Sequence, residues 1–284
     1  MDGILLINKP KDWTSQDVCL KVKHLLRVKK IGHTGTLDPF ATGLMVLTIG
    51  EATKLGQFIE GLDKTYVAKL ELGESTPTGD TETEVNERKE IPNLSKDDIK
   101  KIFASFIGKQ NQLPPMTSAI RVDGKKLYEY AHEGIEIERK PREIEIFGLD
   151  LLDFDGKSII FCAQVSKGTY IRTLGQDIAK ALGTAGYLSA LERLKVGRYL
   201  LKNAINIENV SESKIISIDE ALNFMDRVTL FGEDYKLASN GAPLKLDIKS
   251  PRVAIYNKEN ELIGIYENKN GTYYCLRGFN RENN

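Results

Sequence analysis

The chain has 284 residues, 41% of them hydrophobic, so it can bury one large core and still carry a small appendage. Forty Lys and Arg residues balance forty Asp and Glu residues, and the net charge alone therefore predicts neither nucleic-acid nor membrane affinity. The three scattered cysteines indicate neither a disulfide framework nor a zinc site, and without a signal pattern or an apolar run of ~20 residues we expect a soluble cytoplasmic protein.

The first predicted elements are an apolar strand and a basic helix. Residues 3–7 are apolar and predict a short strand, which ends before Asn8-Lys9-Pro10. Thr14 and Asp17 match a capping box, and apolar residues follow at helical spacing, so we expect an amphipathic helix over residues 15–27. Residues 1–30 carry seven Lys or Arg against three Asp, which is typical of a solvated face or of a surface for an anionic partner.

The next segment, GHTGTLDPFATG at residues 32–43, places one carboxylate, Asp38, in a stretch unsuited to a helix or a central strand. Glycine permits backbone angles closed to other residues, and Pro39 fixes its own φ and favours an extended Asp38. Asp before Pro is also a common turn, so the motif alone leaves a structural role open. The apolar residues 44–49 that follow would anchor the loop on a rigid element, where chemistry is often found, and make Asp38 a candidate site residue.

Helices and strands then alternate up to about residue 230. Alternation predicts a half-buried strand over residues 65–72, with Tyr66 on its apolar face. Residues 114–142, rich in charge, Gly and Tyr, suggest a partly mobile excursion from the core. The other expected elements are a short helix at 51–59, a capped helix from residue 95 to about 106, a strand at 158–166 and a helix at 172–182.

The character of the sequence changes after residue 230. Three short strands, at 253–256, 262–267 and 272–277, are separated by polar turns. This pattern predicts a small all-β appendage.

Three groups of residues could support chemistry on a planar polar substrate: His33 with Asp38, Tyr66, and SKGTYIR at residues 166–172. The guanidinium of Arg172 could hold the Asp38 carboxylate bidentately and keep it ionised, while a tyrosine could stack on a base.

Other interpretations stay open for each group. Tyr66 fits a core position, Arg172 could pair with surface acids, and His33 could bond the loop backbone. The turn around Lys167 looks like an anion cradle but lacks Walker spacing. Asp80 with Asp38 could form a glycosidase pair.

Six blocks, in order along nearly the whole chain, resemble the tRNA pseudouridine synthases of the TruB type, which isomerise uridine 55 in the T-arm of tRNA. The blocks are GILLINKPKDWTS, GHTGTLDPFATG, GEATKL, KTY, LPPMTSAIRVDGKKLYEYAHEG and SKGTYIRTLGQDI.

The resemblance implies a role for individual residues. Asp38 would be the catalytic aspartate, Tyr66 would contact the target base from the opposite side, and Arg172 would pair with Asp38. It further implies that His33 helps to displace the flipped nucleotide and that the remaining site residues are Tyr170 in the pocket, Leu191 beside the uracil, and Lys9 near the active site. From the anion cradle we expect Lys167 to contact RNA.

The resemblance also implies an α+β fold with a mixed, mostly antiparallel central sheet and flanking helices. Residues 1–230 would form the catalytic domain and residues 231–284 a short PUA-like RNA-binding domain. We expect a monomer that acts on tRNA without cofactor, metal or membrane. The sequence departs from the family at Arg121, His132 and Glu192, and the acidic Glu192 makes a phosphate contact there doubtful.

Two rival functions are compatible with the residues. One is a non-catalytic RNA-binding protein that keeps the scaffold, and the other is a hydrolase that uses Asp38 and Asp80 on a nucleoside or glycoside. Isomerisation differs from hydrolysis because it releases neither free uracil nor sugar.

Overall fold

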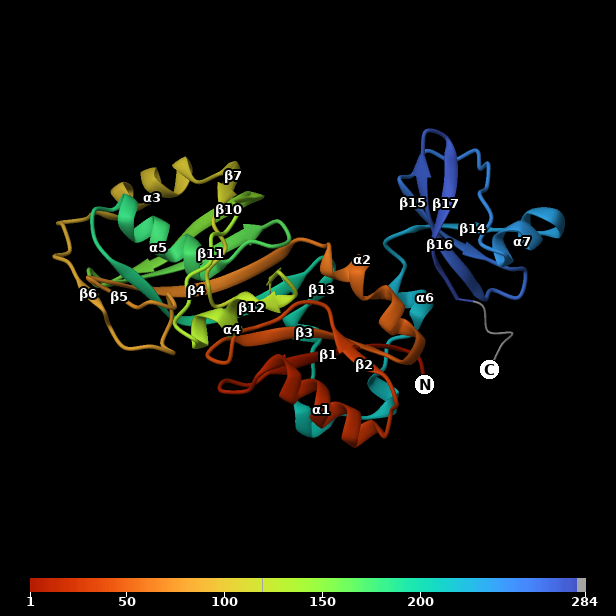
Figure 1. Cartoon of the computed structure of the whole chain (residues 1–284), viewed down its shortest axis with the longest axis horizontal. Coiled ribbons are helices and arrows are strands. Elements are labelled where there is room, and N and C mark those ends of the chain that lie inside the picture. Colours follow the sequence, from red (N-terminus) through yellow and green to blue (C-terminus); the bar gives the residue numbers. More distant parts are fainter. Residues whose placement is uncertain (119, 280–284) are drawn as a thin grey trace.

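The computed structural model describes residues 1–118 and 120–279, with His132 described by its backbone only. A nine-stranded sheet forms the larger part of the molecule (Figure 1). Its main path runs in the order β1-β3-β12-β4-β11-β10-β7, and β2 and β13 pair with β3 and β12. The strands are β1 Gly3–Lys9, β2 Ile31–His33, β3 Thr42–Ile49, β4 Lys64–Leu72, β7 Gly108–Gln112, β10 Arg142–Phe154, β11 Ser158–Val165, β12 Gly186–Val196 and β13 Tyr199–Leu200.

The sheet is mixed and mostly antiparallel, as the resemblance implied. Among the described strands of this sheet, only β3 and β12 pair in parallel, through a register of Glu192 with Thr42 and Arg193 with Gly43. The predicted alternation in β4 is confirmed, because every second side chain from Lys64 to Leu72 is buried. Strands β10 and β12 were not predicted.

Helices cover the sheet and complete its core. Helix α1 (Ser15–Leu26) begins with the predicted Thr14–Asp17 capping box, and α3 (Lys96–Ser105) begins with a second capping box. Helix α5 (Ile171–Ala181) follows β11 and lies near α3 (Figure 1). Apolar side chains of all three helices join those of the sheet in one continuous buried cluster. Shorter elements are η1 Gly50–Leu55, α2 Gly56–Glu60, η2 Leu201–Asn203, η3 Ile207–Asn209, η4 Glu212–Lys214 and α6 Ile218–Ala221.

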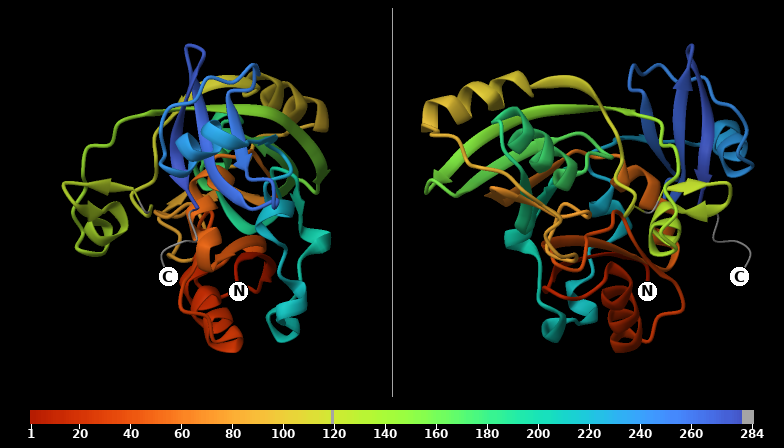
Figure 2. Two further views of the ribbon diagram at one scale, coloured as in Figure 1. Left: turned by 90° about the vertical axis from the view of Figure 1, so that its right-hand side faces the viewer. Right: turned by 60° about the vertical axis from the view of Figure 1, so that its left-hand side comes forward.

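Two small hairpins extend from the large sheet. One pairs β5 (Glu74–Ser75) with β6 (Glu87–Arg88). The other pairs β8 (Arg121–Val122) with β9 (Lys125–Lys126) and continues into α4 (Leu127–His132). This second unit lies within the expected excursion and projects away from the rest of the molecule (Figure 2). The excursion therefore has secondary structure of its own, and its mobility stays a prediction.

The C-terminal part is a small β domain, with one helix that the sequence pattern did not predict. Its four-stranded sheet has the order β14-β15-β16-β17. The elements are β14 Asp226–Thr229, α7 Gly232–Ser239, β15 Arg252–Tyr256, β16 Leu262–Lys269 and β17 Thr272–Gly278. Because α7 is present, the expectation of an all-β appendage was wrong. Strand β14 lies before residue 231, where the second domain was expected to begin.

The two parts share a buried apolar contact. Ala254, Tyr256 and Ile265 of the small sheet pack in one cluster with Ile4 and Leu44 of the large one. On the described residues, no helix is long and apolar enough to cross a membrane.

Candidate active site

The site is built around the turn that connects β2 to β3 and carries Asp38. Ser15, at the start of α1, bonds both backbone groups of Leu37: its hydroxyl donates to the carbonyl at 3.0 Å and accepts from the N–H at 2.9 Å. Buried Lys9 donates from Nζ to the carbonyls of Pro39 at 3.1 Å and Ala41 at 2.7 Å. These bonds fix the backbone on both sides of Asp38, as expected for a structured loop.

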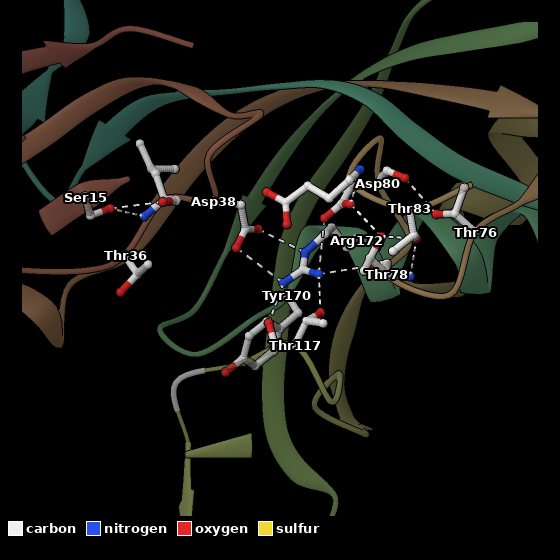
Figure 3. A network of polar contacts seen from close by, with 12 residues as sticks. Ser15, Thr36, Asp38, Thr76, Thr78, Asp80, Thr83, Thr117, Tyr170 and Arg172 are labelled. Atoms are coloured by element: carbon white, nitrogen blue, oxygen red, sulfur yellow. Dashed lines mark hydrogen bonds and ion pairs between the residues drawn. The ribbon is translucent and has the colours of Figure 1, made fainter. Parts of the chain in front are cut away.

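Arg172, in the first turn of α5, holds the Asp38 carboxylate through two contacts (Figure 3). Its Nε lies 2.9 Å from Oδ2 and its Nη2 lies 3.3 Å from Oδ1. Only 4% of the Arg172 side chain is exposed, against 30% of the Asp38 side chain. The arginine is thus an internal support, and the carboxylate that it orients stays open to solvent on one side. The surface role considered for Arg172 was wrong.

A second carboxylate, Asp80, contacts the same guanidinium from inside the protein. Its side chain is 0% exposed, and its Oδ2 lies 3.3 Å from Nη1 of Arg172. Its Oδ1 accepts from the Thr78 hydroxyl at 2.6 Å and from the Glu82 N–H at 2.9 Å. Asp38 and Asp80 therefore meet at one arginine. Because a fully buried Asp80 cannot reach a sugar from solvent, this geometry argues against a glycosidase pair.

Threonines complete the coordination of the guanidinium (Figure 3). Nη1 of Arg172 also donates to the Thr78 carbonyl at 2.8 Å and to the Thr117 hydroxyl at 2.6 Å, and Nη2 donates to the Thr117 carbonyl at 2.9 Å. The arginine thus joins α5 to the loop after β5 and to the start of the excursion. The sequence analysis did not identify Thr78 and Thr117, and it considered Asp80 only as a partner of Asp38. The acidic residue within TPTGD was the one feature of the sequence that pointed to this part of the site.

The surroundings of Asp38 shift the pKa of its carboxyl in two opposite directions. Burial raises the pKa of its carboxyl above the ordinary value, and the nearby negative charge of Asp80 adds to the rise. The charge and hydrogen bonds of Arg172 lower the pKa and so favour the ionised form. At Lys9, burial lowers the pKa to about 8, and the charge of Asp38 opposes this change. Arg172 and Lys9 are therefore the cations that support an Asp38 carboxylate.

The other predicted residues lie on elements next to this turn. His33 ends β2, and its buried Nδ1 has no hydrogen-bond partner among the described residues. Burial, with a contribution from Arg193, lowers the pKa of His33, which favours a neutral ring. Tyr66 on β4 and Leu191 on β12 are both buried in the main apolar cluster.

Two predicted residues lie on the segment between β11 and α5. Tyr170 precedes α5, and its backbone N–H and carbonyl bond the Gln112 side chain at 2.8 and 3.1 Å. Its ring lies beside Arg172 and Thr117 (Figure 3). Lys167 is exposed on this turn.

The departures from the family pattern have different surroundings. Arg121 lies exposed on β8 and donates to the Gly124 carbonyl at 2.9 Å, so the excursion keeps its positive charge there. Glu192 is half-buried on β12, where it pairs with Thr42. The side chain of His132 lies outside the described residues. In the described part of the chain, no cluster of His, Cys, Asp or Glu could hold a metal ion.

Comparison with known proteins supports one family. The sequence model of the TruB family pseudouridylate synthase N-terminal domain matches residues 23–171. The tRNA pseudouridine synthase B of Bacillus cereus is 40% identical, over 94% of this chain and 92% of that protein. The tRNA pseudouridine synthase B of Mesoplasma florum is 38% identical, over 97% of each chain.

Solved structures show the same fold at lower sequence identity. A chain in the structure of an H/ACA RNP bound to a substrate RNA containing 2′-deoxyuridine has a TM-score of 0.72 and 22% identity, covering 99% of this chain and 86% of that one. A chain of a Cbf5-Nop10-Gar1 complex has a TM-score of 0.72 and 21% identity, covering 98% of this chain and 84% of that one.

Proposed function

Because the chain belongs to the TruB family of pseudouridylate synthases and is a tRNA pseudouridine synthase, we propose that Asp38 is its catalytic residue and uridine 55 of the tRNA T-arm its target. The observation that carries the proposal is the contact between Asp38 and Arg172. A partly exposed carboxylate, held by two bonds to a buried guanidinium, is oriented toward whatever enters from solvent.

The reaction makes few demands beyond a positioned carboxylate. The N1–C1′ bond of uridine breaks, the uracil turns while it stays bound, and C5 joins C1′. N1 gains a proton and C5 loses one, so no atom is transferred to or from another molecule. Asp38 acts in its ionised form, whether it attacks C1′ or removes a ribose proton. Arg172 supports that form by opposing the rise in the pKa of Asp38.

A base inside an RNA fold must leave its stack before it can reach Asp38. In this proposal the half-buried His33 occupies the space that the uridine leaves, and its neutral ring suits an apolar gap between bases. Tyr66, Tyr170 and Leu191 contact the extruded uracil. Tyr66 and Leu191 are buried on β4 and β12 and Tyr170 is half-buried just before α5, which is compatible with a small pocket that opens when RNA binds.

Positive side chains around the site supply the RNA contacts. Exposed Lys167 lies on the turn just before Tyr170, and the excursion brings Arg121, Lys125 and Lys126 on its hairpin. Such contacts bind phosphates and position the RNA, while the unstacked loop bases provide selectivity. The proposal assigns residues 1–230 to catalysis and residues 231–284 to a PUA-like RNA contact by a monomer, and it keeps the expected cytoplasmic location.

Incubation of the full chain with a uridine-labelled T-arm stem-loop, followed by nucleoside analysis, tests the proposal. We expect pseudouridine at position 55 and at no other uridine. A matched stem-loop with cytidine at that position should yield none. Pseudouridine at another position would refute the assigned target, free uracil would indicate a hydrolase, and RNA binding without any product would indicate a binding protein.

A further inference from the structure

A second buried arginine, Arg193 on β12, holds the first half of the Asp38 turn. Its Nε donates to the Leu44 carbonyl at 2.7 Å, its Nη2 to the Gly35 carbonyl at 3.1 Å and its Nη1 to the Thr36 carbonyl at 3.4 Å. All three bonds go to backbone oxygens, and Arg193 forms no ion pair with any residue that the structure describes. A buried guanidinium without a carboxylate is costly, so its three directed bonds are the feature that a role must explain.

The position of Arg193 in the sheet connects the turn to the strand of Tyr66. Its backbone is paired with Tyr66 of β4 on one side and with Gly43 of β3 on the other. Gly43 has φ +103°, and a Cβ there would lie 2.5 Å from the Arg193 carbonyl oxygen. Arg193 therefore lies between the strand of Tyr66 and the strand that follows the turn, and its side chain bonds the turn itself.

Two of the three carbonyls that Arg193 holds, those of Gly35 and Thr36, lie between His33 and Asp38. Lys9 holds two carbonyls that follow Asp38, those of Pro39 and Ala41. The backbone is therefore held by hydrogen bonds on both sides of Asp38. The positive charge of Arg193 also contributes to the lowered pKa of His33.

We propose that Arg193 is a positioning residue for the reaction, which sets the distance from Asp38 to a base held at Tyr66 and keeps His33 in register with both. The inference rests on the proposed function of Asp38. Removing the guanidinium would free the backbone of Gly35 and Thr36 without touching the RNA contacts on the excursion. A misplacement of about 1 Å at a reacting group costs about 100-fold in rate, so the effect belongs in kcat.

The test compares Arg193→Met and Arg193→Lys with the wild-type chain on the T-arm stem-loop. We expect kcat to fall about 100-fold in Arg193→Met, with KM changed by less than about threefold. Arg193→Lys keeps the charge but has one nitrogen for three carbonyls, so its kcat should lie between that of wild type and that of Arg193→Met. Amide exchange of residues 34–38 should speed up in both variants. If Arg193→Met does not fold, Arg193→Lys gives the same comparison.

Two control variants separate positioning from stability. Tyr199→Phe removes a buried bond to the Ala221 carbonyl at 2.7 Å, and so lowers stability without removing a bond to the Asp38 turn. Arg88→Met removes an exposed arginine that pairs with Glu74. Both should keep the wild-type kcat. An unchanged kcat in the Arg193 variants, or an equal loss of kcat in Tyr199→Phe, would overturn the role of Arg193 and leave the proposed function of Asp38 intact. A wild-type chain that makes no pseudouridine would overturn the proposed function first.

Discussion

The change Arg172→Lys tests the support of Asp38 at its most connected point. The guanidinium makes six polar contacts, to both Asp38 oxygens, to Asp80, to the Thr78 carbonyl and to two Thr117 oxygens. A lysine has three donors on one nitrogen, so at least half of these contacts are lost. Breaking buried charged contacts costs about 3–5 kcal/mol, and because lysine keeps the charge we expect the lower end, about 3 kcal/mol, in unfolding free energy.

The same change should alter the rate and its pH dependence. Asp38 loses its bidentate orientation, and kcat should fall about 100-fold. Burial already raises the pKa of Asp38 and Arg172 opposes the rise, so a weaker cation lets the pKa rise further. The acid limb of the kcat/KM profile then moves to higher pH, and raising the pH recovers part of the loss.

The assay is pseudouridine formation on the T-arm stem-loop between about pH 5 and pH 9, with denaturant unfolding as the stability measurement. Arg172→Lys with a wild-type kcat and an unmoved acid limb would refute the reasoning, since it would show that Asp38 does not depend on the guanidinium.

Further predictions concern the same neighbourhood. Asp80→Asn removes a charge that raises the pKa of Asp38, so the acid limb should move to lower pH, opposite to Arg172→Lys, while kcat falls about tenfold in the same assay; an upward shift would contradict this. Gly43→Ala, at φ +103° and with its Cβ 2.5 Å from the Arg193 carbonyl, should lower the unfolding free energy by about 1–3 kcal/mol in urea; a loss below about 0.5 kcal/mol would contradict the crowding. Because the pKa of Asp38 is raised in the folded protein, Asp38 stabilises the fold at pH values below its ordinary pKa, and this stability is lost as the pH rises through the folded-state pKa. Asp38→Asn should therefore melt no lower than wild type at pH 7, and a clear fall in Tm would contradict the raised pKa. RNA affinity should weaken steeply with added salt in filter binding, and a flat response would exclude phosphate contacts.

Local signals predicted much of the fold. The Thr14–Asp17 capping box fixed the start of α1, and strict alternation identified β4. Both signals depend only on residues a few positions apart in the sequence, so they can be recognised without knowledge of the tertiary structure.

Strands with irregular register were missed for a physical reason. Strand β12 shifts register between Leu188 and Ala190 and again between Arg193 and Lys195. Strand β10 shifts between Ile146 and Gly148. Each shift breaks the two-residue period, and a pattern search then finds no strand. The edge strand β14 is short and half exposed, which leaves little alternation to detect.

The site was predicted in part. Asp38 was visible because its loop is unusual, and the ion pair with Arg172, 134 residues away, is present as expected. The place of Asp80 beneath that arginine could not be predicted, because it depends on how a surface hairpin folds back over α5. Arg193 was missed because β12 was not predicted and nothing in LERLK marks this arginine as buried; only the structure shows its burial and its bonds to the turn.

Asp38→Asn is the most direct test of the central claim, since it removes the charge and keeps the shape. The variant should bind the T-arm stem-loop as wild type does, because the proposed phosphate contacts lie on other residues. Nucleoside analysis after prolonged incubation should then detect no pseudouridine at position 55, whereas wild type converts that uridine. Substantial turnover by Asp38→Asn, with binding intact, would show that another residue performs the chemistry.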